Sequence, residues 1–392
     1  MPERGRPRRR TIPSWARWNP IGAEAPWTVG LEEELVLVDP LTGGIASRID
    51  DVLEAAADPL RDHLSAETQA CVVELKTDPH ATVGGAVADV ARLRCLVEDV
   101  VREELGLSIM AAGMHPLATS AEVKVARLHR YEKVHASLRG LARREPTMAL
   151  HVHVAVPGVE SAVRALDGVL ADLPILLALS SNSPYWHGED SGLASARAVM
   201  LSMLPRSGMP RQFGRYANWV ATIDALIRSR AIPGPGFVWW DVRLQPSLGT
   251  VEVRIMDAQP RLDDVGALAA IVQCLIRLHA EGPPPSSVPP ELLAENRFLA
   301  ARAGNEAQLL DVRTLGLRPM RGALAELLAR CSPLAFELGC AREMANAGLL
   351  SLDGGYRRQR RLVALHGIDR LPQELAREFG QTAVPLQAAP GL

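Results

Sequence analysis

The chain has 392 residues, of which 47% are hydrophobic and 22% are charged. This composition is that of an ordinary folded globular protein, and it excludes collagen-like, disulfide-stapled and largely disordered chains. The formal net charge of −2 gives no overall positive field, which argues against a nucleic-acid partner.

The first half of the chain predicts four strands and one long helix. Residues 1–26, with five arginines among the first ten, predict a disordered basic and proline-rich tail, and a catalytic domain is expected over residues 27–380. Apolar or alternating runs closed by proline predict strands, and apolar residues at helical spacing predict a helix. In order, these are a strand in TVGLEEELVLVDP, a strand from Cys71 to Lys76, a helix from Val83 to Leu105, and strands in LSIMAAGMHP and TMALHVHVAVPG.

The second half is mainly helical, apart from two strands that follow a loop and a helix. These strands, FVWWDVRLQP and VEVRIMDAQP, are separated by SLGT, which predicts an antiparallel hairpin. Hairpins with helices between them indicate an α+β fold around a mainly antiparallel sheet, with helices on one face and a site on the other. Helices are expected at Ser161–Leu179, Val265–Ala280, Glu291–Ala303 and from Arg321 onward, with a proline-rich connector at 282–290 and a flexible tail at 381–392.

Two exclusions concern the cellular setting. No window approaches the roughly 18 uncharged apolar residues that a membrane span needs. The five cysteines are scattered without a CxxC pair, which favours reduced thiols. We therefore expect a cytoplasmic protein without a membrane partner.

The first strand carries three consecutive glutamates. Because side chains alternate across a strand, Glu32 and Glu34 share one face and Glu33 points to the other. Two carboxylates on one face repel each other unless a cation offsets their charge, which indicates a bound divalent metal. The competing interpretation is a solvated face of an edge strand.

Other strands repeat this arrangement of polar pairs. Two histidines on one face can address one site as neutral imidazole ligands, and a carboxylate beside a guanidinium suits a site for metal and phosphate. A polar outer face or a cross-strand ion pair is the structural alternative. Glu74 is an acid within an apolar strand and needs a partner. The pairs are His151 with His153, Glu252 with Arg254, and Asp241 with Arg243.

Four strands thus present acids, imidazoles or arginines on what can be a single sheet face. Oxygen-rich sites with little thiol favour magnesium, or manganese, over zinc. The sequence contains neither a GxxxxGK[ST] loop nor a strand-linked GxGxxG. A nucleotide would therefore have to bind through metals and arginines.

These motifs resemble those of the carboxylate-amine ligases of the glutamate-cysteine ligase type 2 family, and they occur in the same order. The resemblance spans roughly residues 27–304, and its long central motif is specific. The motifs are TVGLEEELVLVDP, VVELKT, AAGMHP, HVHVAV, LLALSSNSPYWHGEDSGLASAR, WWDVRLQP, TVEVRIMD and ENRFLAARAG.

The resemblance implies a glutamine synthetase-like sheet, two or three Mg²⁺ ions, and activation of a glutamate-like carboxylate by ATP as an acyl phosphate that an amine then displaces. Both substrates would be small molecules, and a homodimer is compatible with the family. Arg254 would hold the transferred phosphate, and Glu34 would share in catalysis. The implied metal ligands are Glu32, Glu34, Glu74, His153 and Glu252, the implied nucleotide contacts are Arg243, Arg254, Asn296 and Arg297, and the implied substrate contacts are His151 and Arg197.

Two other functions stay open. One is a kinase that phosphorylates a guanidino group and stops, and the other is a non-catalytic binding protein with a vestigial site. A ligase releases ADP, phosphate and an amide, whereas a kinase leaves the phosphate on the acceptor. The acid and the amine are also open, because four residues beside the expected substrate pocket depart from the family pattern: Ala149, Leu150, Ala155 and Ala196.

Overall fold

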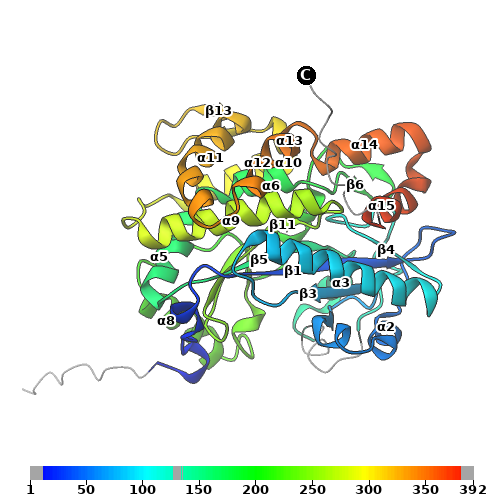
Figure 1. Ribbon diagram of the computed structural model, residues 1–392, viewed down its shortest axis with the longest axis horizontal. Helices are drawn as coiled ribbons and strands as arrows, with labels where there is room; N and C mark the ends of the chain where they lie inside the picture. The colour runs from blue at the N-terminus through cyan, green and yellow to red at the C-terminus, as the bar shows by residue number, and fades with distance from the viewer. Residues whose placement is uncertain (1–11, 127–133, 135, 381–392) are drawn as a thin grey trace, which may run out of the picture.

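The computed structural model describes residues 12–126, 134 and 136–380, and a seven-stranded sheet crosses the molecule (Figure 1). The strand order is β10-β11-β5-β1-β3-β2, β4 also pairs with β1, and every pair is antiparallel. The predicted α+β fold around a mainly antiparallel sheet is confirmed. The strands are β1 Val29–Val38, β2 Leu64–Ala66, β3 Val72–Lys76, β4 Ser108–Met110, β5 Ala149–Ala155, β10 Val242–Gln245 and β11 Thr250–Asp257.

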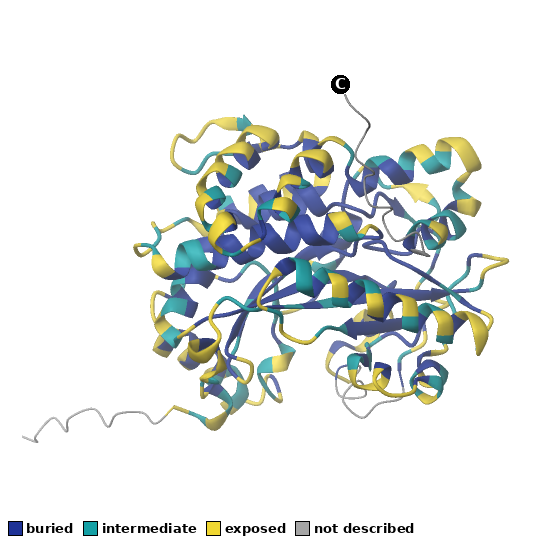
Figure 2. Cartoon of the chain, in the orientation of Figure 1, coloured by how far each residue is buried: buried dark blue, intermediate teal, exposed yellow. Residues whose placement is uncertain are grey.

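Helices cover one face of the sheet, as predicted. Two long helices, α3 (Val83–Glu103) and α9 (Leu262–Glu281), lie side by side across this face (Figure 1). Leu31, Val152 and Val253 alternate with the polar residues of their strands and pack into the core beneath these helices. α9 is buried along nearly its whole length, whereas α3 exposes a stripe to solvent (Figure 2).

Local signals fix the helix ends. Thr82 caps α3, because its hydroxyl oxygen accepts a hydrogen bond from the Gly85 N–H at 3.2 Å. The single helix predicted from Ser161 to Leu179 is instead two helices, α5 (Val159–Val169) and α6 (Leu173–Ser180). Pro174 lies in the first turn of α6, where a missing N–H has no cost, but inside one continuous helix it would remove a hydrogen bond.

The predicted hairpin is confirmed as β10 and β11, with one difference in the first strand. Trp239–Trp240 forms a separate short strand, β9, which pairs in parallel with β8 (Ser207–Gly208). The predicted helices at Val265–Ala280 and Glu291–Ala303 correspond to α9 and α10 (Pro290–Ala303), and the connector between them has no regular secondary structure.

Part of the predicted N-terminal tail is ordered. Residues 1–11, like the predicted tail at 381–392, lie outside the described residues. Within residues 12–26, however, the carbonyl oxygen of Ala16 accepts a hydrogen bond from the Tyr216 hydroxyl at 2.6 Å, and Trp18 Nε1 donates to the Val156 carbonyl at 3.1 Å. Apolar and aromatic side chains of residues 12–26 therefore pack on the domain, although the first ten residues of the chain are basic.

The remaining helices surround these layers. Within the described ranges, no helix combines the length and the apolarity that a bilayer crossing requires. The other elements are η1 Ser14–Ala16, α1 Ile21–Glu24, α2 Ile49–Ala55, η2 Leu60–His63, η3 Arg139–Arg143, β6 Tyr185–Trp186, β7 Glu189–Asp190, α7 Ala196–Leu201, α8 Tyr216–Arg228, η4 Pro235–Phe237, η5 Gly304–Glu306, β12 Gln308–Leu310, β13 Leu317–Pro319, α11 Met320–Glu337, α12 Ala341–Ala345, α13 Ala347–Leu352, α14 Gly355–His366, η6 Ile368–Arg370 and α15 Leu371–Gly380.

Candidate active site

Strand register aligns the predicted acids and histidines on the sheet face that α3 and α9 leave open. Glu32 of β1 stands opposite His151 of β5, and Glu34 stands opposite Glu74 of β3. Glu252 of β11 stands opposite His153 in the same way. Antiparallel pairing therefore brings side chains from four strands into one row, which we call the acidic row.

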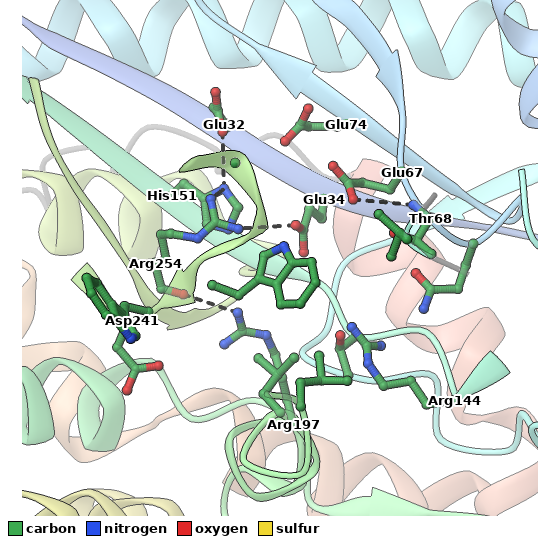
Figure 3. Close-up of a pocket in the computed structure, with 18 of the residues that line it drawn as sticks. Glu32, Glu34, Glu67, Thr68, Glu74, Arg144, His151, Arg197, Asp241 and Arg254 are labelled. Atoms are coloured by element: carbon green, nitrogen blue, oxygen red, sulfur yellow. Dashed lines mark hydrogen bonds and ion pairs between the residues drawn. The ribbon is translucent and has the colours of Figure 1, made fainter. Parts of the chain in front are cut away.

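The acidic row, together with Glu67 from the segment after β2, supplies three overlapping groups of candidate metal ligands. Within each group the ligand atoms lie within 4.8 Å of one another. Figure 3 shows Glu32, Glu34, Glu67 and Glu74 along one side of the cavity, with His151 beside them. Such carboxylate-rich groups suit Mg²⁺ or Mn²⁺. The groups are Glu32 with His153 and Glu252, Glu32 with Glu74 and His151, and Glu34 with Glu67 and Glu74.

The imidazole of His153 fits a metal ligand. Its Nδ1 lies 3.1 Å from the hydroxyl oxygen of Thr250, while its buried Nε2 has no hydrogen-bond partner among the described residues. That Nε2 lies 3.4 Å from a Glu32 oxygen and 3.8 Å from a Glu252 oxygen. A hydrogen bond at one ring nitrogen commonly orients the other toward a metal, so a cation between Nε2 and the two carboxylates fits this arrangement.

Burial and neighbouring charges oppose each other at two of the acids. Burial raises the pKa of Glu32, but the charge of His153 and a hydrogen bond with His151 outweigh burial and hold this pKa well below its usual range. Burial likewise raises the pKa of Glu252, and the charges of Arg243 and Arg254 bring it well below the usual range. Both groups are therefore carboxylates at neutral pH.

Two other members of the acidic row respond mainly to burial. Burial raises the pKa of Glu34, although Arg197 and Arg254 act in the opposite direction. Burial and the nearby charge of Arg254 lower the pKa of His151 to about 4, so its imidazole is neutral at pH 7. A cation beside Glu34 would stabilise its ionised form, and a neutral His151 can act as a ligand.

Arginines on β10 and β11 lie beside the acids, as the strand pattern predicts. Arg243 Nε donates to a Glu252 oxygen at 2.6 Å, and Arg254 forms a close ion pair with the other oxygen of this carboxylate. Arg254 Nη1 also lies 3.3 Å from His151 Nδ1. Both guanidinium groups line the cavity together with Glu32 and Glu34. Positive charge therefore adjoins the candidate metal groups, where phosphate oxygens could be held.

The acidic row forms one wall of a cavity of about 390 Å³, and loops and helix ends form the rest. Arg144, which precedes β5, lines this cavity and donates to the Glu145 carbonyl at 3.1 Å. It makes no ion pair with a carboxylate in the part of the chain that the structure describes. Burial lowers the pKa of Arg144 to about 10; in reaching this value the charge of Glu34 opposes burial, and that of Arg197 adds to it.

Several cavity residues were not predicted from the sequence. Glu67, Thr68 and Arg144 lie in irregular segments, where no strand alternation assigns a face. Trp239 and Trp240 directly precede the predicted Asp241, and both line the cavity. The position of Glu67, an acid shortly before the strand that carries Glu74, is a sequence signal that could have indicated this group.

Two predicted nucleotide contacts lie outside the cavity. Asn296 uses its side-chain amide to pair with the backbone N–H and C=O of Leu310, at 2.7 and 2.8 Å. Arg297 pairs with Asp241 through Nε at 2.6 Å and donates to the Ala198 carbonyl at 2.9 Å. Neither side chain lines the cavity, although Asp241 does. The structure therefore brings the predicted metal and phosphate residues together, but not Asn296 and Arg297.

Comparisons with known proteins agree with this fold. A crystal structure of glutamate-cysteine ligase from Francisella tularensis, in complex with AMP, matches with a TM-score of 0.67 at 14% identity, over 92% of this chain and 90% of that one. A bifunctional glutathione synthetase from Pasteurella multocida matches with a TM-score of 0.63 at 16% identity, over 90% of this chain and 52% of that one. Both likenesses support the glutamine synthetase-like fold that the motifs implied.

Sequence comparison gives the family. A protein of Rubrobacter xylanophilus, provisionally named glutamate-cysteine ligase 2-3, is 39% identical over 349 residues, which are 88% of this chain and 95% of that protein. The model of glutamate-cysteine ligase family 2 (GCS2) matches residues 28–379. The family match covers most of the chain, and the acidic row supplies candidate metal ligands. The chain therefore belongs to glutamate-cysteine ligase family 2 and is a ligase.

Proposed function

We propose that this ligase uses ATP and Mg²⁺ to join the carboxylate of a glutamate-like amino acid to an amine through an acyl phosphate. The observation that carries the proposal is the acidic row, with three candidate cation sites beside the guanidinium groups of Arg243 and Arg254. Cations in a row beside arginines suit the phosphates of a nucleotide. Mn²⁺ could replace Mg²⁺ at such oxygen-rich sites.

The unpartnered nitrogen of His153 and the carboxylates around it support a cation at one end of the row. Glu32 and Glu252 would complete that site, and the groups containing Glu74 would hold further ions. Bound cations would neutralise phosphate charge and orient the terminal phosphoryl group. Glu74 is already fixed for this role, because Ser65 Oγ donates to it at 2.6 Å and Lys76 Nζ lies 2.6 Å from the same oxygen.

The reaction has two steps. A carboxylate oxygen of the acid attacks the terminal phosphorus of ATP, and the bond to ADP breaks. The nitrogen of the amine then attacks the acyl carbon, the carbon–oxygen bond to phosphate breaks, and the nitrogen loses a proton to give the amide. Arg254 would hold the phosphoryl oxygens during transfer, where a fixed guanidinium stabilises developing charge.

Arg144 indicates where an anionic part of a substrate could bind. A half-buried guanidinium that has no carboxylate ion pair among the described residues is unfavourable, and an anion from the ligand would relieve this. Arg144 is near Glu34 and Arg197 in the same cavity (Figure 3). A second carboxylate on the acid, as in a glutamate-like amino acid, would fit here. Arg144 thus supports an acid with a second anionic group as the substrate. The test described next would identify the amine.

A screen of amino acids and amines tests the proposal. Purified protein with Mg²⁺ and ATP should release phosphate only when both an acid and an amine are present, and mass spectrometry should find ADP and an amide. Removal of the metal with a chelator should stop the release. A phosphorylated acceptor without free phosphate would identify a kinase, and ATP binding without any product from the panel would favour a non-catalytic binding protein.

A further inference from the structure

β11 contains a bulge at Arg254, the residue proposed to hold the phosphoryl group. Val253 pairs with Val152 of β5, but the next pair joins Met256 to Leu150, so β11 has one extra residue in this interval. A bulge bends its strand, re-aims a side chain and leaves backbone groups outside the ladder. Arg254 projects from this irregular point into the cavity.

Arg197, the first-turn residue of α7, supplies hydrogen bonds to the bulge. Its Nη2 donates to the carbonyl oxygen of Arg254 at 3.1 Å, and its Nη1 donates to that of Ile255 at 3.0 Å (Figure 3 shows the first of these contacts). Only 4% of Arg197 is exposed, so water cannot readily take its place. Buried carbonyls need partners, and the planar fork of a guanidinium matches two adjacent oxygens.

Asp257 in turn fixes Arg197. The Asp257 carboxylate is fully buried and lies 3.5 Å from Arg197 Nη1. It accepts hydrogen bonds from the backbone N–H of Asn182 at 2.8 Å and from the hydroxyls of Ser183 and Ser195 at 2.8 and 3.0 Å. The motif LLALSSNSPYWHGEDSGLASAR therefore contacts the end of β11 and places Arg197 beside the bulge.

The other side of Arg254 is held by Asp241, the residue just before β10. The Arg254 N–H donates to the carbonyl oxygen of Asp241 at 2.8 Å. The Asp241 carboxylate is held in turn by Arg297, whose Nη1 donates to the Ala198 carbonyl of α7. Arg197 and Arg297 thus connect the backbone around Arg254 to α7 from both sides.

We infer that Arg197 is a positioning residue: it stabilises the β11 bulge that directs Arg254 into the cavity, and it does not bind the substrate carboxylate. The inference rests on the proposed role of Arg254. Both terminal nitrogens of Arg197 already donate to backbone carbonyls, and only Nε lacks a partner among the described residues. The family resemblance implied that Arg197 contacts the substrate. We assign it instead a role in shaping β11.

The test compares Arg197→Lys with a matched control, Arg164→Lys. Arg164 also donates to a backbone carbonyl, that of Ala280 at 2.7 Å, but it does not line the cavity. Hydrogen exchange of the ligand-free protein is measured by mass spectrometry on peptides covering Thr250–Asp257. Turnover, the KM of the acid and the melting temperature are measured in parallel, alone and combined with Arg254→Lys.

Amides of β11 should exchange roughly tenfold faster in Arg197→Lys but not in Arg164→Lys, because only the first variant loosens the bulge. Turnover should fall about tenfold or more while the KM of the acid stays within about threefold. In the double variant, Arg197→Lys should add little to the loss caused by Arg254→Lys, because both changes disturb one unit.

A KM for the acid that rises tenfold with normal turnover and unchanged exchange would overturn the inference and make Arg197 a substrate contact. Losses that multiply in the double variant would also overturn it. If the wild type shows no ATP-dependent ligation, the proposed function fails, but the exchange measurement still decides the role of Arg197. Unchanged exchange of β11 in the Arg197→Lys variant would then refute the inference by itself.

Discussion

Arg94 of α3 forms a bidentate ion pair with Glu33 of β1 on the helix-covered face of the sheet. Nε donates to one carboxylate oxygen at 2.8 Å and Nη2 to the other at 2.6 Å. The same guanidinium donates to the carbonyls of Gln259 and Pro260, just after β11. The middle glutamate of the EEE run is therefore neutralised on the face opposite Glu32 and Glu34, and β1 is tied to the strand that carries Arg254.

Arg94→Met should destabilise the fold, because it leaves the Glu33 carboxylate buried and unpaired. Breaking a buried ion pair typically costs about 3–5 kcal/mol. Urea unfolding should show this loss. The surface pair of Arg102 with Asp99 offers a control, since Arg102→Met removes a solvent-exposed pair that contributes little to stability. Equal stability changes in the two variants would contradict a structural role for the Arg94–Glu33 pair.

Glu34→Gln and Glu252→Gln should each weaken magnesium-dependent ATP binding by about tenfold or more, since each removes a charge while keeping side-chain size. Calorimetric titration with ATP at several Mg²⁺ concentrations measures the effect. Glu103→Gln, at an exposed position on α3, is the control and should leave binding unchanged. Unaltered metal dependence and turnover in both cavity variants would rule out metal coordination by these two acids.

Arg254→Lys should fold normally and lose about 10²-fold in turnover, because lysine keeps the charge but loses the bidentate fork. The KM values should change much less, since the contact is expected to strengthen as the phosphoryl group transfers. Steady-state kinetics and thermal unfolding of the same samples separate two roles. Near-normal turnover with a modest stability change would mean that Arg254 only forms an ion pair with Glu252.

Arg144→Gln should raise the KM of the acid about tenfold while turnover changes little, because a charge-assisted contact to a substrate anion is lost. The neighbouring Arg143→Gln is a matched control, since Arg143 is exposed and does not line the cavity. Kinetics with the acid and with ATP varied separately measure the effect. A rise in the KM of ATP instead would assign Arg144 to the nucleotide phosphates.

His115 predicts a pH-dependent stability. Its Nε2 donates to the Gly43 carbonyl at 2.8 Å, its Nδ1 accepts from the Ala118 N–H at 3.0 Å, and burial lowers its pKa to about 4. The unfolded chain, with a pKa near 6.5, then binds a proton that the folded protein excludes between these values. The contribution of neutral His115 to the free energy of unfolding is complete above about pH 6.5. It decreases by up to about 3 kcal/mol as the pH falls toward 4.

Urea unfolding at pH 7.5 and pH 5 checks the His115 prediction. His115→Asn should be less stable than the wild type at pH 7.5, and the difference should shrink at pH 5. His366→Asn is the control, because His366 is exposed on α14 and should not alter the pH dependence. A constant difference between wild type and His115→Asn at both pH values would show that the proton is not excluded on folding.

The sequence by itself determined which side chains share a face of each strand. Alternation is local, so it assigned Glu32, Glu34, His151 and His153 to one side of their strands and Glu33 to the other without any knowledge of neighbours. The turn SLGT between two alternating runs predicted the hairpin in the same way. The ordered motifs were enough to identify the family, which the match over residues 28–379 confirms.

Only the tertiary structure decided which strands are neighbours and what the arginines touch. The order β11-β5-β1-β3 sets Glu252 opposite His153 and Glu34 opposite Glu74, and pairing between strands far apart in sequence depends on contacts that no local period records. Glu67 and Arg144 reach the cavity from irregular segments. The bulge at Arg254 required the pairing register with β5, and the role of Arg197 followed from the two carbonyls that this bulge leaves for its guanidinium.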